Sequence, residues 1–189
     1  MIYLNNYGWN DKLSQLKQES TYNALTHGRI SIVHRTCYEV VSENGLFQCE
    51  LTGNMMYGKS DIELPCTGDW VLFQPFDEHK GIIVDMLPRE RTLYRKKNGT
   101  VADKQAIASY VDKAFIVQSL DDNFNVRRAE RFMVQMQEEN INPVLVFNKA
   151  DLGFDEQKVE EQIRHIARQI PVFFTSIHQP QTILQLRES

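Results

Sequence analysis

Cysteine is scarce in this chain of 189 residues, and its three cysteines follow no metal-binding or disulfide pattern. Cys37, Cys49 and Cys66 are odd in number and show neither CxxC nor Cys/His spacing. This disfavours a disulfide framework or a zinc site and favours reduced thiols. The sequence also lacks an apolar run near the ~20 residues of a membrane-spanning helix, and its N-terminus lacks the basic start and apolar stretch of a secretory signal. We therefore expect a cytoplasmic protein without a membrane partner.

An excess of positive charge is lacking as well. The formal net charge is −4, which excludes a uniformly basic nucleic-acid binder but leaves room for a local basic patch. Residues 89–97 hold five basic residues and one acid, and no other segment concentrates positive charge in this way. Hydrophobic residues make up 42% of the chain and charged residues 24%, values that argue against a disordered or coiled-coil protein.

The first half of the chain has the pattern of short strands. Residues 1–28 are polar with short apolar groups, and we interpret them as an N-terminal extension. Five strand-like runs follow in residues 29–94, among them a hairpin at Asn44-Gly45, whose residues tolerate the positive φ of a type I′ turn. Five short strands suit a small antiparallel β barrel, and the OB-fold, which often binds oligonucleotides, is the commonest candidate. An SH3-like barrel is the alternative that the pattern leaves open.

From residue 105 the pattern changes to that of an α/β protein. Short, nearly continuous apolar runs are typical of strands covered on both faces, and stretches of helical periodicity separate them. The runs lie at 114–120, 143–147 and 171–174, and the helical stretches at 127–140, 155–170 and from 183. Strands that alternate with helices predict a three-stranded parallel sheet with right-handed crossovers.

The most informative motif is Asn148-Lys149-Ala150-Asp151, directly after the apolar run 143–147. Doubly wound sheets bind ligands at the carboxyl ends of their strands. An Asp carboxylate there can accept hydrogen bonds from guanine N1–H and the 2-amino group, donors that adenine does not offer in that position. Asn can hydrogen-bond the imidazole edge, and the Lys stem can cover the ring plane. The motif therefore indicates guanine recognition, with a plain polar turn as the alternative.

A second element, Thr175-Ser176-Ile177, follows the next apolar run. In guanine-nucleotide folds, this strand–loop junction supplies backbone N–H groups to guanine O6. Taken alone, the element is more typical of a Thr/Ser turn. Its position one strand after the first motif favours a role for Ser176 and Ile177 in supporting the base.

The chain resembles the circularly permuted GTPases that assist maturation of the small ribosomal subunit, the RsgA/YjeQ type. The resemblance runs along nearly the whole sequence and is carried by YGWN, GRI-x3-HR-x2-Y-x-V, PCTGDWV, LPRER-x2-YRKK, QAIA followed by VD, VQSLDDNFNVRRAERFMV and VLVFNKADL. It implies an extension at 1–28, an OB-fold RNA-binding domain at 29–94, a linker at 95–113 and part of a permuted, P-loop-type GTPase domain at 114–189. It also implies GTP hydrolysis stimulated by the small ribosomal subunit. That subunit and its ribosomal RNA are the expected partners, and DNA is not expected to be one.

The basic residues of the first half are interpreted with the same resemblance. Arginines and lysines around Tyr94 suit contacts to an RNA backbone plus one stacked base, and a solvated linker between domains is the alternative. The expected RNA-binding residues are Arg29, Arg35, Arg89, Arg91, Arg95, Lys96 and Lys97.

The family places its phosphate loop after the base-recognition motifs, and the sequence contains no GxxxxGK[ST]. Such a loop holds the β- and γ-phosphates and helps to hold Mg²⁺. We therefore expect these residues to bind GTP or GDP weakly and to hydrolyse neither, with no catalytic residue and no metal ligand. Mg²⁺ and Zn²⁺ are expected only in a full-length protein.

Residues 115–119 are expected to form an open sheet edge, because in the complete fold the phosphate-loop strand lies beside them. Such an edge invites self-association or leaves the C-terminal half marginally stable. Two alternatives to an enzyme stay open at this point. One is a non-enzymatic RNA- or ribosome-binding protein, and the other is a gene fragment without a function of its own.

Overall fold

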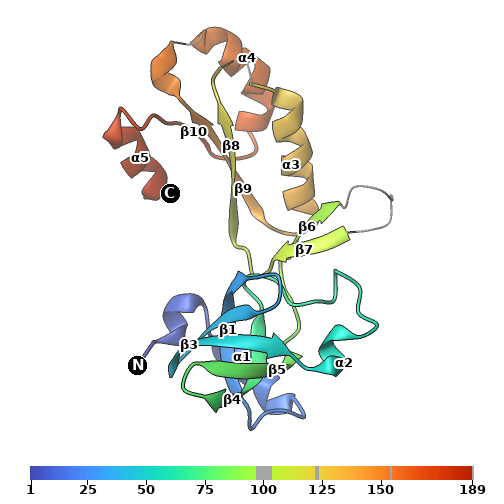
Figure 1. Ribbon diagram of the computed structural model, residues 1–189. Helices are drawn as coiled ribbons and strands as arrows, with labels where there is room; N and C mark the ends of the chain where they lie inside the picture. The colour runs from blue at the N-terminus through green and yellow to red at the C-terminus, as the bar shows by residue number, and fades with distance from the viewer. Residues whose placement is uncertain (97–103, 122–123, 154, 189) are drawn as a thin grey trace. The chain divides into compact units, whose positions relative to one another are not determined.

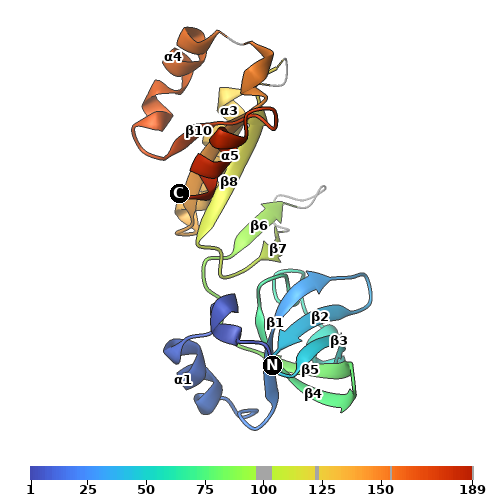
Figure 2. The same ribbon diagram turned by 90° about the vertical axis from the view of Figure 1, so that its left-hand side faces the viewer.

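The computed structural model describes residues 1–96, 104–121, 124–153 and 155–188, in two compact units, Met1–Val111 and Asp112–Ser189 (Figure 1 and Figure 2). The first unit contains η1 (Leu4–Tyr7), α1 (Asp11–Glu19), β1 (Thr26–Val33), β2 (Tyr38–Ser42), β3 (Gly45–Leu51), α2 (Gly53–Met56), β4 (Trp70–Asp77), β5 (Lys80–Met86), β6 (Leu93–Lys96) and β7 (Lys104–Ala108). The second contains β8 (Lys113–Ser119), α3 (Val126–Glu138), β9 (Asn142–Asn148), η2 (Ala150–Leu152), α4 (Glu156–Ala167), β10 (Val172–Phe174) and α5 (Pro180–Arg187). Within the described ranges, no helix combines the length and the apolar character needed to cross a membrane.

The first unit is built on a closed five-stranded barrel with the strand order β1-β2-β3-β5-β4. Strand β4 pairs back onto β1 and closes the ring, and β3 and β5 are parallel neighbours in an otherwise antiparallel barrel. Alternate side chains point inward, so Ile30, Val40 and Phe73 meet in a core where each is at most 1% exposed. The five-stranded barrel predicted from the sequence is confirmed.

The hairpin between β2 and β3 forms at the predicted place, but its turn is of another type. Ser42 pairs with Gly45, so Glu43 and Asn44 are the two central residues. Positive φ occurs at Gly45, where it is 125°, and at neither central residue. Because a type I′ turn needs positive φ at both central positions, the predicted turn type is wrong.

The N-terminal residues add a second apolar core on the outer side of the barrel. Leu4 and Leu13 are 1% and 2% exposed and pack with Trp70 and Leu72 of β4. The side chain of Asn10 caps α1 by accepting a hydrogen bond from the Leu13 amide. The segment therefore contributes buried residues to the first unit. The division of the chain at 28, 94 and 113 stays a prediction.

Strands β6 and β7 pair antiparallel into a two-stranded sheet within the first unit. The family resemblance places most of this segment in the linker predicted at 95–113. The end of β7 is tied to the loop before β4, because Ala108 forms a bridge with Thr67 and the Ser109 amide donates to the Thr67 carbonyl at 2.9 Å. This close approach places backbone against backbone at Gly68.

Gly68→Ala is expected to destabilise the first unit by about 3 kcal/mol. Gly68 has φ +94°, and a Cβ there would lie 2.3 Å from the carbonyl oxygen of Ser109. Gly58→Ala is the matched control, since Gly58 has a similar φ of +73° but nothing within 4 Å of the added Cβ. Urea unfolding followed by tryptophan fluorescence measures both variants. Equal losses in the two would contradict the steric argument.

The second unit is a three-stranded sheet with the order β10-β9-β8 in which both pairings are parallel. Helices α3 and α4 supply Met133 and Ile163 to the core against Leu145 and Phe147 of β9. Helix α5 contacts β10 (Figure 2). The predicted parallel sheet with intervening helices is confirmed. Strand β8 has a single neighbour in this sheet among the described residues.

Candidate functional site

The two predicted base-binding motifs lie side by side at the carboxyl ends of β9 and β10. The strands are in parallel register, with Phe174 opposite Phe147, so the residues that follow them emerge at one edge of the sheet. Two backbone hydrogen bonds join the motifs: the Thr175 amide donates to the Phe147 carbonyl at 2.8 Å, and the Ala150 amide donates to the Thr175 carbonyl at 3.1 Å. The sheet register therefore brings together what the sequence places 27 residues apart.

Asn148 and Lys149 form the turn out of β9. Asn148 is half-buried, and its Oδ1 accepts a hydrogen bond from the Thr175 hydroxyl at 3.4 Å. Lys149 adopts the left-handed conformation with φ 63° and ψ 35°, which is strained for a residue with a Cβ. This turn leads directly into η2, which begins at Ala150. The Lys149 ammonium pairs with Asp121, 2.8 Å away, in the loop after β8.

Asp151 is exposed and keeps an ionised carboxylate at the edge of the sheet. Its Oδ1 accepts a hydrogen bond from the Ser176 hydroxyl. This bond is the main cause of a pKa below the usual value for Asp, and the nearby His178 lowers it further. An ionised carboxylate accepts hydrogen bonds and donates none. The Asp151 side chain therefore suits a ligand edge that presents two donors.

Ser176 supports Asp151 from the neighbouring strand end. The side chain is fully buried, and besides donating to Asp151 it accepts a hydrogen bond from the His178 amide at 3.0 Å. The Ser176 amide, one of the groups expected to contact guanine O6, donates to the Thr182 hydroxyl at 3.0 Å in this structure. Ile177 is 76% exposed. The O6 contact of Ser176 and Ile177 stays a prediction.

Two residues of this edge were missed in the sequence. Thr182 belongs to neither of the two base-binding motifs, and only the position of α5 in the structure shows its contact with Ser176. Asp121 carried a signal that could have been used, because it follows the apolar run of β8 and the carboxyl ends of parallel strands share one edge.

The residues predicted to bind RNA are placed differently from one another. The Arg89 guanidinium forms an ion pair with the fully buried carboxylate of Asp69, with Nη2 and Oδ2 2.6 Å apart, and also donates to the carbonyls of Ile62 and Leu64. Arg29 donates to the carbonyls of Gly68 and Tyr7. Both side chains therefore hold the first unit together.

Three other predicted RNA-binding residues, Arg35, Arg91 and Arg95, have described side chains, and none of the three is buried. Arg35 and Arg95 are exposed, and Arg91 forms an ion pair with Glu90 at 3.3 Å. Lys96 is the last residue of β6, and Lys97 lies outside the described residues. The role of all seven residues in RNA binding, Arg29 and Arg89 included, stays a prediction.

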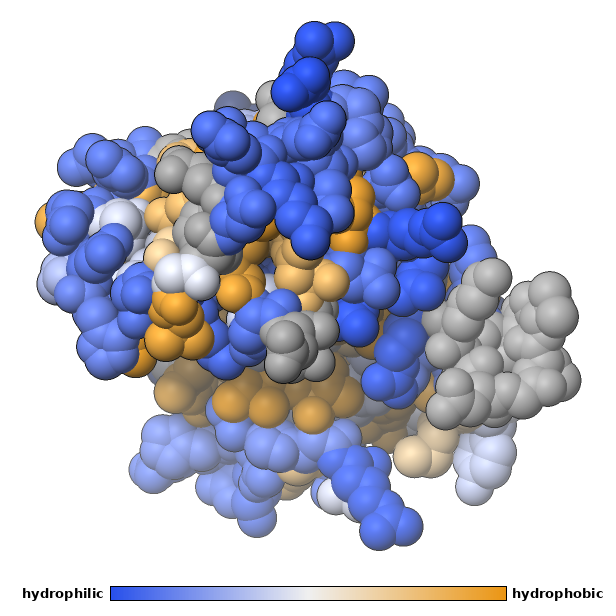
Figure 3. All heavy atoms as spheres, turned by 90° about the horizontal axis from the view of Figure 1, so that it is seen from above, coloured by the Kyte–Doolittle hydropathy of each residue, from blue (hydrophilic) through white to orange (hydrophobic). Residues whose placement is uncertain are grey.

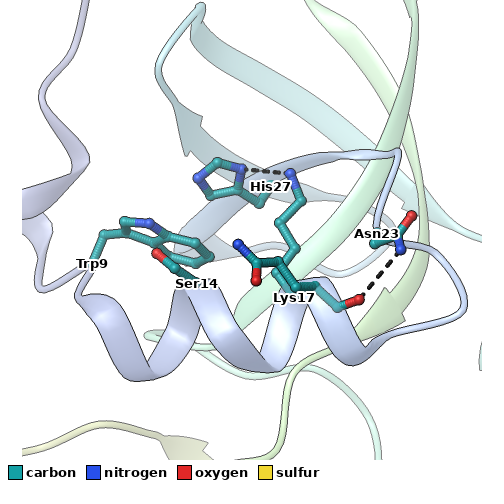
Figure 4. Close-up of a pocket in the computed structure, with 6 residues that line it drawn as sticks. Trp9, Ser14, Lys17, Asn23 and His27 are labelled. Atoms are coloured by element: carbon teal, nitrogen blue, oxygen red, sulfur yellow. Dashed lines mark hydrogen bonds between the residues drawn. The ribbon is translucent and has the colours of Figure 1, made fainter.

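A pocket of about 390 Å³ lies apart from these residues, between α1 and the start of β1 (Figure 4). The Lys17 ammonium lies 3.2 Å from Nδ1 of His27, whose ring packs against Trp9 with 4.1 Å between centroids and a tilt of 33° between the planes. Burial, and then the charge of Lys17, lower the pKa of His27. None of the predicted site residues lines this pocket. In the part of the chain that the structure describes, no three His, Cys, Asp or Glu side chains gather to hold a metal ion.

Comparison with known proteins gives matches that agree with one another. The sequence model of the RsgA GTPase family matches residues 86–189. The chain is 73% identical over 183 residues to the small ribosomal subunit biogenesis GTPase RsgA 1 of Bacteroides thetaiotaomicron, covering 97% of this chain and 52% of that protein. It is 30% identical over 179 residues to an RsgA of Opitutus terrae, covering 89% of this chain and 49% of the relative.

Solved structures show the same fold. The crystal structure of YjeQ from Thermotoga maritima superimposes with a TM-score of 0.64 at 24% identity, covering 86% of this chain and 56% of that one. The circularly permuted GTPase YloQ superimposes with a TM-score of 0.59 at 21% identity, covering 88% and 57%. The chain therefore spans about half the length of the curated relatives that it matches.

Proposed function

The chain belongs to the RsgA GTPase family, and from that premise we propose that its second unit recognises the guanine base of GTP and GDP in a cytoplasmic protein that assists maturation of the small ribosomal subunit. The single observation that carries this proposal is the pairing of Asp151 with Ser176 across the carboxyl ends of β9 and β10. It holds an ionised acceptor where parallel sheets bind their ligands. The relatives are small ribosomal subunit biogenesis GTPases by name, which supports the wider role in ribosome biogenesis.

Each residue of the edge has a proposed part in base recognition. Asp151 accepts hydrogen bonds from guanine N1–H and the 2-amino group, and Ser176 fixes the direction of that carboxylate. Asn148 faces the imidazole edge, and the stem of Lys149 covers the ring plane. Ala150 and Ile177 contribute backbone. Adenine leaves the Asp151 acceptor without donors, which is the physical basis of selectivity.

Bond cleavage is not assigned to any residue of this sequence. Phosphoryl transfer depends on groups that hold the phosphates and the metal ion, and these 189 residues contain no GxxxxGK[ST] motif. We expect weak binding of GTP and GDP, and we assign neither Mg²⁺ nor Zn²⁺ to the described side chains.

For the first unit, we propose that the OB-type barrel binds ribosomal RNA rather than DNA. The exposed Arg35 and Arg95 support contacts with an RNA backbone. If the chain is instead a non-enzymatic RNA-binding protein, it uses the same surface. Filter binding with small-subunit RNA at two salt concentrations tests it, because phosphate contacts weaken steeply with salt.

The experiment that tests base recognition is a titration of the ¹⁵N-labelled chain with GDP and, separately, with ADP. We expect GDP at millimolar concentration to shift the amide signals of residues 148–151 and 175–177, and ADP to leave them in place. Equal shifts with both nucleotides, or none with GDP, would contradict the proposal. Such a result would leave RNA binding as the better candidate function.

The second unit suggests a second copy of the chain as a further partner, bound through the open sheet edge at β8. Phe115 and Val117 are 51% and 60% exposed on β8, and Figure 3 shows apolar residues at the surface among hydrophilic ones. Val117→Lys is expected to shift a dimer to monomer in sedimentation velocity, since a charge on an edge strand opposes strand pairing. Val134→Lys on α3 is the control, because Val134 is 50% exposed on a helix. A wild-type chain that is monomeric at high concentration would refute self-association.

A further inference from the structure

Asp121 lies at the same sheet edge as the candidate base site but belongs to neither base-binding motif. It follows β8, the third strand of the parallel sheet, by two residues. Its two carboxylate oxygens have different partners: Oδ1 accepts the Ser119 hydroxyl at 2.7 Å, and Oδ2 lies 2.8 Å from the Lys149 ammonium. The hydrogen bond from Ser119, the last residue of β8, fixes the direction of the Asp121 carboxylate. The carboxylate in turn holds the Lys149 ammonium at a defined position.

The backbone fixes this loop to the site as well. Ser119 is opposite Asn148 in the β8–β9 register, and the Leu120 amide donates to the Asn148 carbonyl at 2.9 Å. The loop after β8 and the turn after β9 are therefore connected by a backbone hydrogen bond and by the Asp121–Lys149 ion pair. The distance between Asp121 and Lys149 is set by the sheet register rather than by a flexible loop.

The ion pair is poorly suited to a purely stabilising role. The side chains of Lys149 and Asp121 are 50% and 25% exposed, and exposed ion pairs add little to stability because water and salt screen them. What the pair does fix is the position of a long side chain that is otherwise free to rotate. Lys149 is also two residues from Asp151, so a free ammonium there could reach the carboxylate that is meant for the base.

We propose that Asp121 is a positioning residue for guanine binding, which acts by holding Lys149. This inference rests on the proposed function of the site. Asp121 fixes the Lys149 stem along the plane of the base and removes the ammonium from the Asp151 carboxylate. The Lys149 side chain is then already ordered before the nucleotide binds, so binding does not carry the entropy cost of ordering it.

A double-mutant cycle in GDP affinity tests this role. Asp121→Asn keeps the size of the side chain and removes its charge, and Lys149→Met keeps most of the stem and removes the ammonium. We expect Asp121→Asn to weaken GDP binding about fivefold in the wild-type background and to have no further effect in the Lys149→Met background. A general structural role of Asp121 would weaken binding equally in both backgrounds.

The matched control is Glu130→Gln. Glu130 is also an exposed carboxylate of the second unit with a side-chain hydrogen bond, to His165 Nε2 at 2.6 Å, but it lies on α3 away from the motifs. We expect this variant to bind GDP like the wild type. Should Asp121→Asn fail to fold, Ser119→Ala removes only the hydrogen bond to Oδ1, and its smaller loss of affinity is likewise expected to vanish in the Lys149→Met background.

The outcomes separate the two proposals. A wild-type chain whose signals at 148–151 do not respond to GDP overturns the proposed function, and the role of Asp121 with it. A wild-type chain that binds GDP, combined with an unchanged affinity of Asp121→Asn or with losses that add in the double variant, overturns the positioning role alone.

Discussion

Asp151→Asn is expected to change the base preference of the chain from guanine to xanthine. Guanine presents two donors to the Asp151 carboxylate, whereas xanthine has a carbonyl oxygen in place of the 2-amino group. An Asn amide keeps one acceptor for N1–H and offers an N–H donor to that oxygen. Hydrogen bonds to a charged group contribute about 1.5–3 kcal/mol each. The loss of GDP affinity is therefore expected to reach roughly 100-fold.

The measurement compares GDP and xanthosine diphosphate by the amide shifts of residues 148–151 in wild type and variant. Glu160→Gln is the control, since Glu160 is exposed on α4 and also loses one negative charge. We expect the control to keep the preference for GDP. A variant that loses GDP binding without gaining the xanthine nucleotide would show that Asp151 acts through the local fold rather than at the edge of the base.

The elements that the sequence predicted well are those whose signal is local. Alternating apolar residues predicted the barrel strands, and continuous apolar runs predicted the parallel strands. Both signals are local because successive residues of a strand point to opposite faces of the sheet. The motif at Asn148–Asp151 could likewise be found, since four adjacent residues carry its chemistry and the preceding run places it at a strand end.

The contacts that the sequence did not predict join distant residues. Asp121 and Lys149 are 28 residues apart, and only the β8–β9 register brings them together. The sequence places Arg89 in a basic cluster that is predicted to bind RNA. The composition of a segment does not reveal that one arginine has a buried partner 20 residues earlier. Pairing between β6 and β7 was also missed, because short polar strands have weak periodicity.

Arg89→Met is expected to destabilise the first unit by about 3–5 kcal/mol, because it leaves a buried carboxylate without its partner. The Asp69 side chain is 0% exposed and the Arg89 side chain 12%. Asp69 also accepts a hydrogen bond from the Cys66 amide at 2.7 Å, so the pair fixes the loop before β4. The two tryptophans of the chain, Trp9 and Trp70, both lie in this unit. Urea unfolding followed by tryptophan fluorescence therefore reports on this unit alone.

Two further variants separate the ion pair from the predicted RNA contact. Asp69→Asn combined with Arg89→Met keeps an acceptor for the Cys66 amide and removes both charges, so it is expected to regain part of the lost stability. Arg95→Met removes an exposed arginine of the same basic cluster and is expected to change stability by less than about 0.5 kcal/mol. If Arg89 instead serves RNA, Arg89→Met should unfold like the Arg95→Met control and should weaken RNA binding at low salt. That result would contradict the structural role of the Arg89–Asp69 pair and would support the predicted contact of Arg89 with RNA.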